Sequence, residues 1–204
     1  MEKLNLLQNV HSNLEPPDLD GNTFLMRGNY DYFHYFCDGF SDVGWGCGYR
    51  TLQSICSWII QTLKLEQDVP NIPRIQEILV EIKDKPDRFF GSREWIGTLE
   101  SIYIIDTLFN IQCKVIHISK NESIAKHCDT LKHYFEEFGG LVMMGGDLDA
   151  ASKGIAGIHI SNSSDIYLLV VDPHFVGKVK TKEELYTKNY VKWQKVEEFV
   201  DSSF

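Results

Sequence analysis

The sequence lacks the features that identify membrane, secreted and nucleic-acid-binding proteins. No apolar run approaches the length of a membrane span, and residues 1–17 lack the apolar core of a signal peptide. The five cysteines include no CxxC pair, which argues against a disulfide framework. Acidic residues outnumber basic ones by 29 to 20, and the formal charge of −9 argues against general nucleic-acid binding. We therefore expect a cytoplasmic monomer of one domain (1–204), with no membrane span and no nucleic-acid partner.

The residues with the clearest chemistry lie around Cys47, which has a glycine on each side. Apolar residues follow Cys47 at three- and four-residue spacing and predict a helix: Leu52, Ile55, Cys56, Ile59 and Leu63. Cys47 would then lie at the helix N-terminus, where free N–H groups and the macrodipole favour the reactive thiolate. Gly44, Gly46 and Gly48 would let an extended substrate backbone approach the sulfur.

A second group of polar residues, Asp172-Pro173-His174, follows the apolar run 166–171, which predicts a buried strand. In an extended chain, residues two apart point to the same face, and Pro173 favours that conformation. Asp172 would then accept a hydrogen bond from one ring nitrogen of His174, while the other nitrogen faces Cys47. A simple turn, with Asp172 capping the backbone and His174 exposed, stays open for the triplet alone. Joined to Cys47, the triplet favours a cysteine hydrolase.

The segment 44–53, read together with Asp172-Pro173-His174, resembles the cysteine proteases specific for the ubiquitin-fold modifier. Three further segments resemble landmarks of that family and occur in the same order: residues 32–35, 91–97 and 145–147. The resemblance extends over about residues 28–200. The short N-terminus resembles the compact single-domain member, with residues 1–27 as a lead-in segment.

The resemblance implies a papain-like fold and catalytic roles at matching positions. Cys47 would be the nucleophile, His174 the general base and acid, and Asp172 the residue that orients His174. The hydroxyl of Tyr35 would take part in the oxyanion hole. Without the resemblance, Tyr35 would more often be a core aromatic, since it lies in an aromatic-rich segment.

Substrate contacts are implied mainly at Trp95, which matches the family tryptophan beside the groove for the modifier's C-terminal glycine. By pattern alone Trp95 fits an apolar helix face equally well. The other expected substrate contacts are Trp45, Gly46, Gly48, Gly145 and Gly146. We expect no cofactor and no metal site, because neither His34 with Cys37 nor Cys113 with His117 has a partner pair at zinc-site spacing. His159 lies between two isoleucines and is interpreted as structural, with direct chemistry as the alternative.

The order of the predicted elements indicates an α+β fold, with helices packed on an antiparallel sheet. Besides the Cys47 helix, helices are predicted near 75–82, after Ser92 with Trp95 included, over 124–138 and after Thr181. Strands are predicted over 111–118, 141–144, 155–161 and 166–172. Cys56 and Cys113 are expected in the core.

The resemblance implies a thiol protease that matures the precursor of the ubiquitin-fold modifier and removes the modifier from conjugates. The expected partners are therefore the modifier, its precursor and its conjugates. One alternative is a protease for another ubiquitin-like protein, since autophagy proteases also carry Asp-Pro-His after their cysteine. Another is a modifier-binding adaptor without turnover. The chain stops at Phe204, where the family typically continues for a few residues, so those residues are either dispensable or missing from a shortened chain.

Overall fold

The structure is a computed structural model that describes residues 4–118, 122–145 and 151–199. Its α-helices are α1 (Cys47–Leu63), α2 (Ile72–Glu81), α3 (Thr98–Phe109), α4 (Cys128–Glu137) and α5 (Lys182–Thr187). Short 3-10 turns are η1 (Asp87–Phe89), η2 (Ile124–His127) and η3 (Val196–Glu198). The strands are β1 (Asn22–Leu25), β2 (Val142–Met144), β3 (Lys153–Ile160), β4 (Ile166–Val171) and β5 (Val191–Lys195). The α+β class is confirmed. Within the described ranges, no helix is both long and apolar enough to cross a membrane.

Polar side chains near the helix ends define where several helices begin. The Asn71 side chain accepts the backbone N–H of Arg74 at 2.9 Å and starts α2. Thr181 accepts the N–H of Glu184 at 3.3 Å and starts α5, as its capping pattern predicts. The helix α1 ends just before Lys64, which adopts the left-handed conformation with a φ of 53°.

The sheet is antiparallel throughout, and β3 is its organising strand. The strands are ordered β1-β3-β4-β5, and β2 pairs with β3 beside β1. β1 pairs with residues 157–160 and β2 with residues 153–155, so the two short strands share one edge of β3. The predicted hairpin is confirmed, because β3 and β4 pair with Ile160 opposite Ile166.

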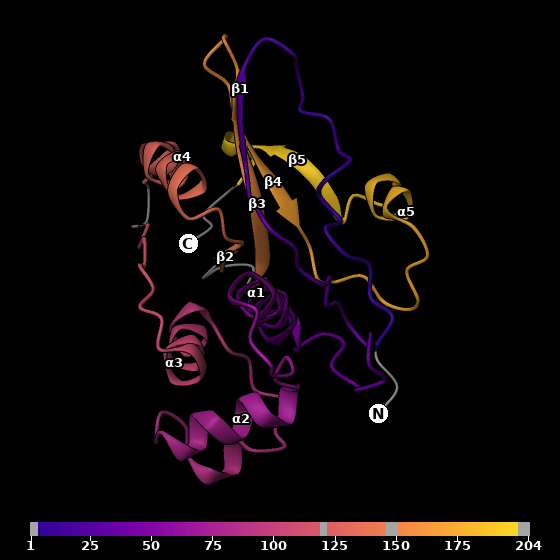
Figure 1. The fold of residues 1–204 in the computed structure, drawn as a ribbon, viewed down its shortest axis with the longest axis vertical. Helices are drawn as coiled ribbons and strands as arrows, with labels where there is room; N and C mark the ends of the chain where they lie inside the picture. Colours follow the sequence, from indigo (N-terminus) through magenta and orange to yellow (C-terminus); the bar gives the residue numbers. More distant parts are fainter. Residues whose placement is uncertain (1–3, 119–121, 146–150, 200–204) are drawn as a thin grey trace.

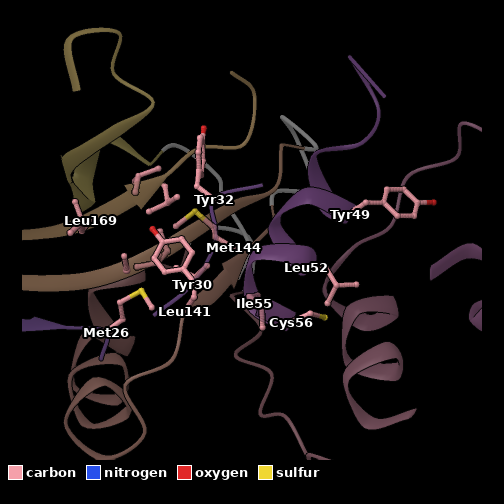
Figure 2. Close-up of a cluster of buried hydrophobic side chains, with 14 of the residues drawn as sticks. Met26, Tyr30, Tyr32, Tyr49, Leu52, Ile55, Cys56, Leu141, Met144 and Leu169 are labelled. Carbon is pink, nitrogen blue, oxygen red and sulfur yellow. The ribbon is translucent and has the colours of Figure 1, made fainter. Parts of the chain in front are cut away.

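The helix α1 lies at the centre of the molecule, between the sheet and the two helices α2 and α3 (Figure 1). α4 packs beside β1 and β3, and α5 lies beside β5. The buried core runs from the sheet side, with Met26, Tyr30 and Leu169, to Leu52 and Ile55 on α1 (Figure 2). Cys47 is therefore the first residue of a helix that packs against the sheet on one side and against α3 on the other.

The predicted strand over 111–118 is wrong, because this segment forms neither strand nor helix. Its alternating apolar residues pair with no strand among the described residues, and alternation alone does not provide partners for the backbone N–H and C=O groups. Cys113 is consequently exposed and not in the core, whereas Cys56 is buried as predicted. The strands β1 and β5 were not predicted, and β1 falls inside the segment interpreted as a lead-in.

Candidate active site

Cys47 is the first residue of α1, as the periodicity predicts, and it is 6% exposed. The residue before it, Gly46, provides no side-chain cap for the helix. The N-terminal N–H groups and the helix dipole therefore act near the sulfur and favour its ionised form.

Asp172 and His174 follow directly after the last residue of β4, and the His174 side chain hydrogen-bonds to Cys47. The Asp172 carboxylate oxygen Oδ1 lies 2.5 Å from His174 Nδ1 and also accepts the His174 backbone N–H at 2.9 Å. Both interpretations of the triplet are thus partly realised, since Asp172 caps the backbone and also holds the ring. With Nδ1 bound to Asp172, the ring presents Nε2 to the thiol.

Tyr35 comes from the loop before α1 and lies against the same histidine. The Tyr35 ring meets the His174 ring edge-on, with 5.1 Å between centroids and an angle of 86°. Its backbone N–H donates to Pro173 O at 2.9 Å, and its hydroxyl bonds to the Cys47 sulfur. The structure therefore brings Cys47, Asp172, His174 and Tyr35 together.

The electrostatics of these groups favour a thiolate and an imidazolium. Burial opposes ionisation of Cys47, but hydrogen bonds from His174, the backbone N–H of Ser152 and Tyr35 lower its pKa overall. Burial also disfavours the charged form of His174, yet Asp172 and Cys47 raise its pKa to about 9. Burial and the neighbouring Cys47 raise the pKa of Tyr35, so its hydroxyl keeps the proton that it can donate.

A cavity of about 300 Å³ opens directly onto these side chains. Its lining is made of Tyr35, Val43, Gly44, Cys47, Trp95, Ala151, His174 and Val176. Trp95 is 54% exposed, and Val43 and Val176 are exposed as well. Exposed apolar side chains thus surround the polar groups of Cys47, His174 and Tyr35, an arrangement typical of ligand sites.

The predicted site residue Trp95 lines this cavity, but it does not lie on a helix. The Glu100 carboxylate accepts the N–H of Gly97 at 2.8 Å, so α3 begins only at Thr98. Ser92 accepts the N–H of Glu94 at 3.1 Å and forms a local turn, not the helix cap that was predicted.

Three of the predicted substrate contacts lie where other parts of the protein pack closely, and as substrate contacts they stay predictions. Trp45 is buried and packs edge-on against Tyr49, with 5.6 Å between ring centroids. A Cβ atom on Gly46 would lie 2.3 Å from Asp42 Oδ2, and one on Gly48 would lie 2.3 Å from Ile96 O. These two glycines therefore admit protein atoms, and Gly48 in particular lets the Trp95 segment approach α1.

The last two predicted contacts lie near β2. Gly145 follows β2 directly, and a Cβ atom placed there would be 3.8 Å from a methyl carbon of Thr98. Gly145 is absent from the cavity lining, whereas Gly146 lies outside the described residues.

His159, the competing histidine, is 1% exposed and belongs to a different set of contacts. Its ring nitrogens bond to Thr23 Oγ1 at 2.7 Å and to Asp18 at 3.2 Å, which attaches the N-terminal segment to β3. The structural interpretation of His159 therefore holds. In the described part of the chain, no group of three or more His, Cys, Asp or Glu side chains is arranged to hold a metal ion.

Sequence reasoning missed several residues of the site. Val43, Ala151 and Val176 line the cavity, and the backbone N–H of Ser152 bonds to the thiol. They come from loops, where no periodic pattern predicts orientation. Gly44, which the sequence analysis expects to leave room for a substrate backbone, does line the cavity, with a φ of 87° that favours glycine.

The arrangement can perform acyl transfer, because a nucleophile, a base with its orienting carboxylate and a hydroxyl donor share one cavity. The sequence pattern of Peptidase family C78 matches residues 21–204. "Probable Ufm1-specific protease 1" of Drosophila melanogaster is 48% identical over 199 residues, covering 98% of this chain and 85% of that protein. Ufm1-specific protease 1 of Mus musculus is 40% identical, covering 98% of this chain and 91% of its own length.

A solved structure agrees with these relatives. The crystal structure of UfSP from C. elegans superposes with a TM-score of 0.80 at 29% identity. The match covers 97% of this chain and 35% of that chain. The match over nearly the whole chain, on top of the active-site geometry, establishes that the chain is a cysteine protease of Peptidase family C78.

Proposed function

We propose that this chain cleaves the bond after the C-terminal glycine of the ubiquitin-fold modifier Ufm1, both in the Ufm1 precursor and in Ufm1 conjugates. The single observation that carries the proposal is the cavity in which Cys47, His174 and Tyr35 face one space. The relatives that share this chain nearly end to end are named Ufm1-specific proteases, which supports Ufm1 as the substrate.

The first chemical step forms a thioester. The Cys47 thiolate attacks the carbonyl carbon of the terminal glycine, and the negative charge develops on the carbonyl oxygen. The Tyr35 hydroxyl donates to that oxygen as the charge develops. The C–N bond then breaks, and the His174 imidazolium gives its proton to the leaving amine.

The second step releases the modifier. His174, now neutral, accepts a proton from a water molecule, and that water attacks the thioester carbonyl. The C–S bond breaks, and the Cys47 thiolate is restored beside the imidazolium. Maturation and deconjugation differ only in the leaving amine, which belongs to a peptide in one case and to a lysine in the other.

The lining also supports a substrate whose cleaved residue is a glycine. Trp95, Val43 and Val176 narrow the cavity with apolar side chains, while Gly44 presents backbone alone. A residue without a side chain passes such walls with the least steric conflict, and its extended backbone brings the carbonyl close to the sulfur.

The test is cleavage of a Ufm1 precursor that carries extra residues after the terminal glycine, followed by mass spectrometry of the products. The parent chain should cut after that glycine, and Cys47→Ala should leave the precursor intact. Cys113→Ala is the matched control, because it removes an exposed thiol that does not line the cavity. That control should cleave at the parent rate.

Precursors of ubiquitin and of an autophagy modifier, incubated in parallel, test the alternatives. Cleavage of either one in preference to Ufm1 would overturn the assignment of the substrate. Ufm1 binding without cleavage, unaffected by alkylation of Cys47, would instead support an adaptor. A cytoplasmic location and a monomeric state stay predictions of the sequence, to be checked by cell fractionation and analytical ultracentrifugation.

A further inference from the structure

A buried ion network beside the active site has no part in the chemical steps above. The Arg50 guanidinium, in the first turn of α1, is completely buried between the carboxylates of Asp38 and Asp42. Asp42 is fully buried too, whereas the Asp38 side chain is 18% exposed. Taking charges out of water is costly, and such networks often contribute little to net stability compared with apolar packing. A purely stabilising role therefore explains this network poorly.

Asp42 connects the two segments that carry Tyr35 and Cys47. Its Oδ1 accepts the backbone N–H of Phe36 at 2.8 Å, directly after Tyr35. Its backbone oxygen accepts the N–H of Gly46 at 2.8 Å, directly before Cys47. The remaining carboxylate oxygen, Oδ2, accepts Arg50 Nε at 2.7 Å and is thereby tied to α1.

Asp38 holds the rest of the loop to the same guanidinium. Arg50 Nη1 and Nη2 each lie 2.8 Å from one oxygen of Asp38, a paired geometry that fixes direction as well as distance. The segment from Phe36 to Asp42 needs such restraint, because Phe36 adopts a left-handed φ of 60° that is unfavourable for an aromatic residue.

We propose that Asp42, held by Arg50, is a positioning residue that sets the Tyr35 hydroxyl beside the Cys47 sulfur. This inference rests on the proposed function, because the separation of the Tyr35 hydroxyl from the Cys47 sulfur affects cleavage only if Tyr35 stabilises the oxyanion. Asp42 does not line the cavity, and its hydrogen bonds hold the backbone on either side of it. After burial and Cys47, the charge of Asp42 also helps to raise the pKa of Tyr35 and so to keep its hydroxyl protonated. The network specifies one separation between donor and nucleophile, as catalysis requires.

The test is a double-mutant cycle in which Asp42→Asn is made in the parent chain and in Tyr35→Phe. Asparagine keeps an acceptor for Phe36 but loses the charged acceptor for Arg50. In the parent we expect kcat on the Ufm1 precursor to fall on the order of 10-fold to 100-fold, with KM changed less than about threefold. In Tyr35→Phe, Asp42→Asn should lower kcat by less than about threefold more, because the group being positioned is already gone.

Equal losses in the two backgrounds would overturn the proposal, since a structural defect alone acts whether or not Tyr35 is present. Glu77→Gln is the matched control: it breaks the exposed ion pair with Arg74 on α2, far outside the cavity lining, and should change neither background. If circular dichroism shows that Asp42→Asn is unfolded, Asp38→Asn replaces it under the same criterion. That change removes the partly exposed partner of Arg50 and should give a smaller loss that again disappears in Tyr35→Phe.

A substrate-free measurement separates this inference from the proposed function. The rate of Cys47 alkylation by iodoacetamide at pH 6.5 reports the thiolate, to which Tyr35 donates a hydrogen bond. Asp42→Asn and Tyr35→Phe should each slow alkylation by about twofold to fivefold, and together no more than either alone. The alkylation measurement stays informative if Ufm1 proves not to be the substrate. Additive decreases of the alkylation rate in the double variant would overturn the positioning role of Asp42.

Discussion

The pKa of Cys47 is lowered and that of His174 is raised, and together the two values define the pH window of the reaction. Hydrogen bonds lower the Cys47 pKa against the effect of burial, and Asp172 with Cys47 raises that of His174 to about 9. The thiolate–imidazolium pair therefore exists above the lowered pKa of Cys47 and below about pH 9. Activity should rise with pH through the first value and fall through the second.

Asp172→Asn should move the alkaline limb of the kcat/KM profile to lower pH, because the carboxylate that raises the His174 pKa is lost. It should also lower kcat/KM by on the order of 10²-fold to 10⁴-fold, since the ring loses its orientation and tautomer. The pH dependence of precursor cleavage measures both effects. Asp165→Asn, which removes an exposed carboxylate paired with Lys195, should leave the profile unchanged. An unmoved alkaline limb in Asp172→Asn would contradict the account of His174.

At the scale of elements, the segment before α1 is joined to the end of β4 by several contacts. The Tyr32 hydroxyl donates to the Asp172 backbone oxygen at 2.5 Å, and Tyr35 forms a parallel bridge with Val176. His34 Nδ1 lies 3.0 Å from Tyr35 O and 3.2 Å from Phe175 O, so one N–H links both segments. Burial lowers the His34 pKa, which keeps this ring neutral near pH 7.

His34→Leu should lower kcat by about tenfold or more and destabilise the fold by about 1–3 kcal/mol, because two buried carbonyl groups lose their donor. His34→Asn should stay within about threefold of the parent, since its amide N–H can occupy the position of Nδ1. Steady-state kinetics and urea unfolding measure the two effects. The role assigned to His34 would be refuted if Leu and Asn behaved alike.

At the scale of the whole molecule, α1 couples the sheet to the other helices. It contacts β2 and β3 on one side and α3 on the other (Figure 1). The buried apolar side chains of these elements form one continuous cluster. Leu52, at the centre of α1, is completely buried, whereas Leu63 at its end is 52% exposed. Such a shared core predicts that the sheet and the helices unfold in one transition.

Leu52→Ala should lower the free energy of unfolding by about 2–5 kcal/mol through the cavity it leaves. Leu63→Ala, the same substitution at an exposed site of the same helix, should change that free energy by less than about 0.5 kcal/mol. Urea unfolding followed by tryptophan fluorescence and by far-ultraviolet circular dichroism provides both values. Separate transitions for the two signals would show that the sheet and the helices unfold independently.

The features that could be predicted from the sequence depend on short-range patterns. The periodicity after Cys47 predicts the helix that begins there, and the apolar run before Asp172 predicts β4, and both elements are present. Residues two apart on an extended backbone also place Asp172 beside His174. These features need only neighbours within a few positions, and the family resemblance linked them into one site.

Features that depend on partners distant in the sequence could be found only in the folded protein. The segment 111–118 alternates in the sequence but pairs with no described strand, while β1 and β5 form because β3 and β4 offer them partners. Gly46 and Gly48 look like openings for substrate in the sequence, but Asp42 and Ile96 occupy those spaces. A buried Arg50 on a helix has no short-range signal at all. Its place follows from carboxylates that the chain brings back to it, and that return is a property of the folded molecule.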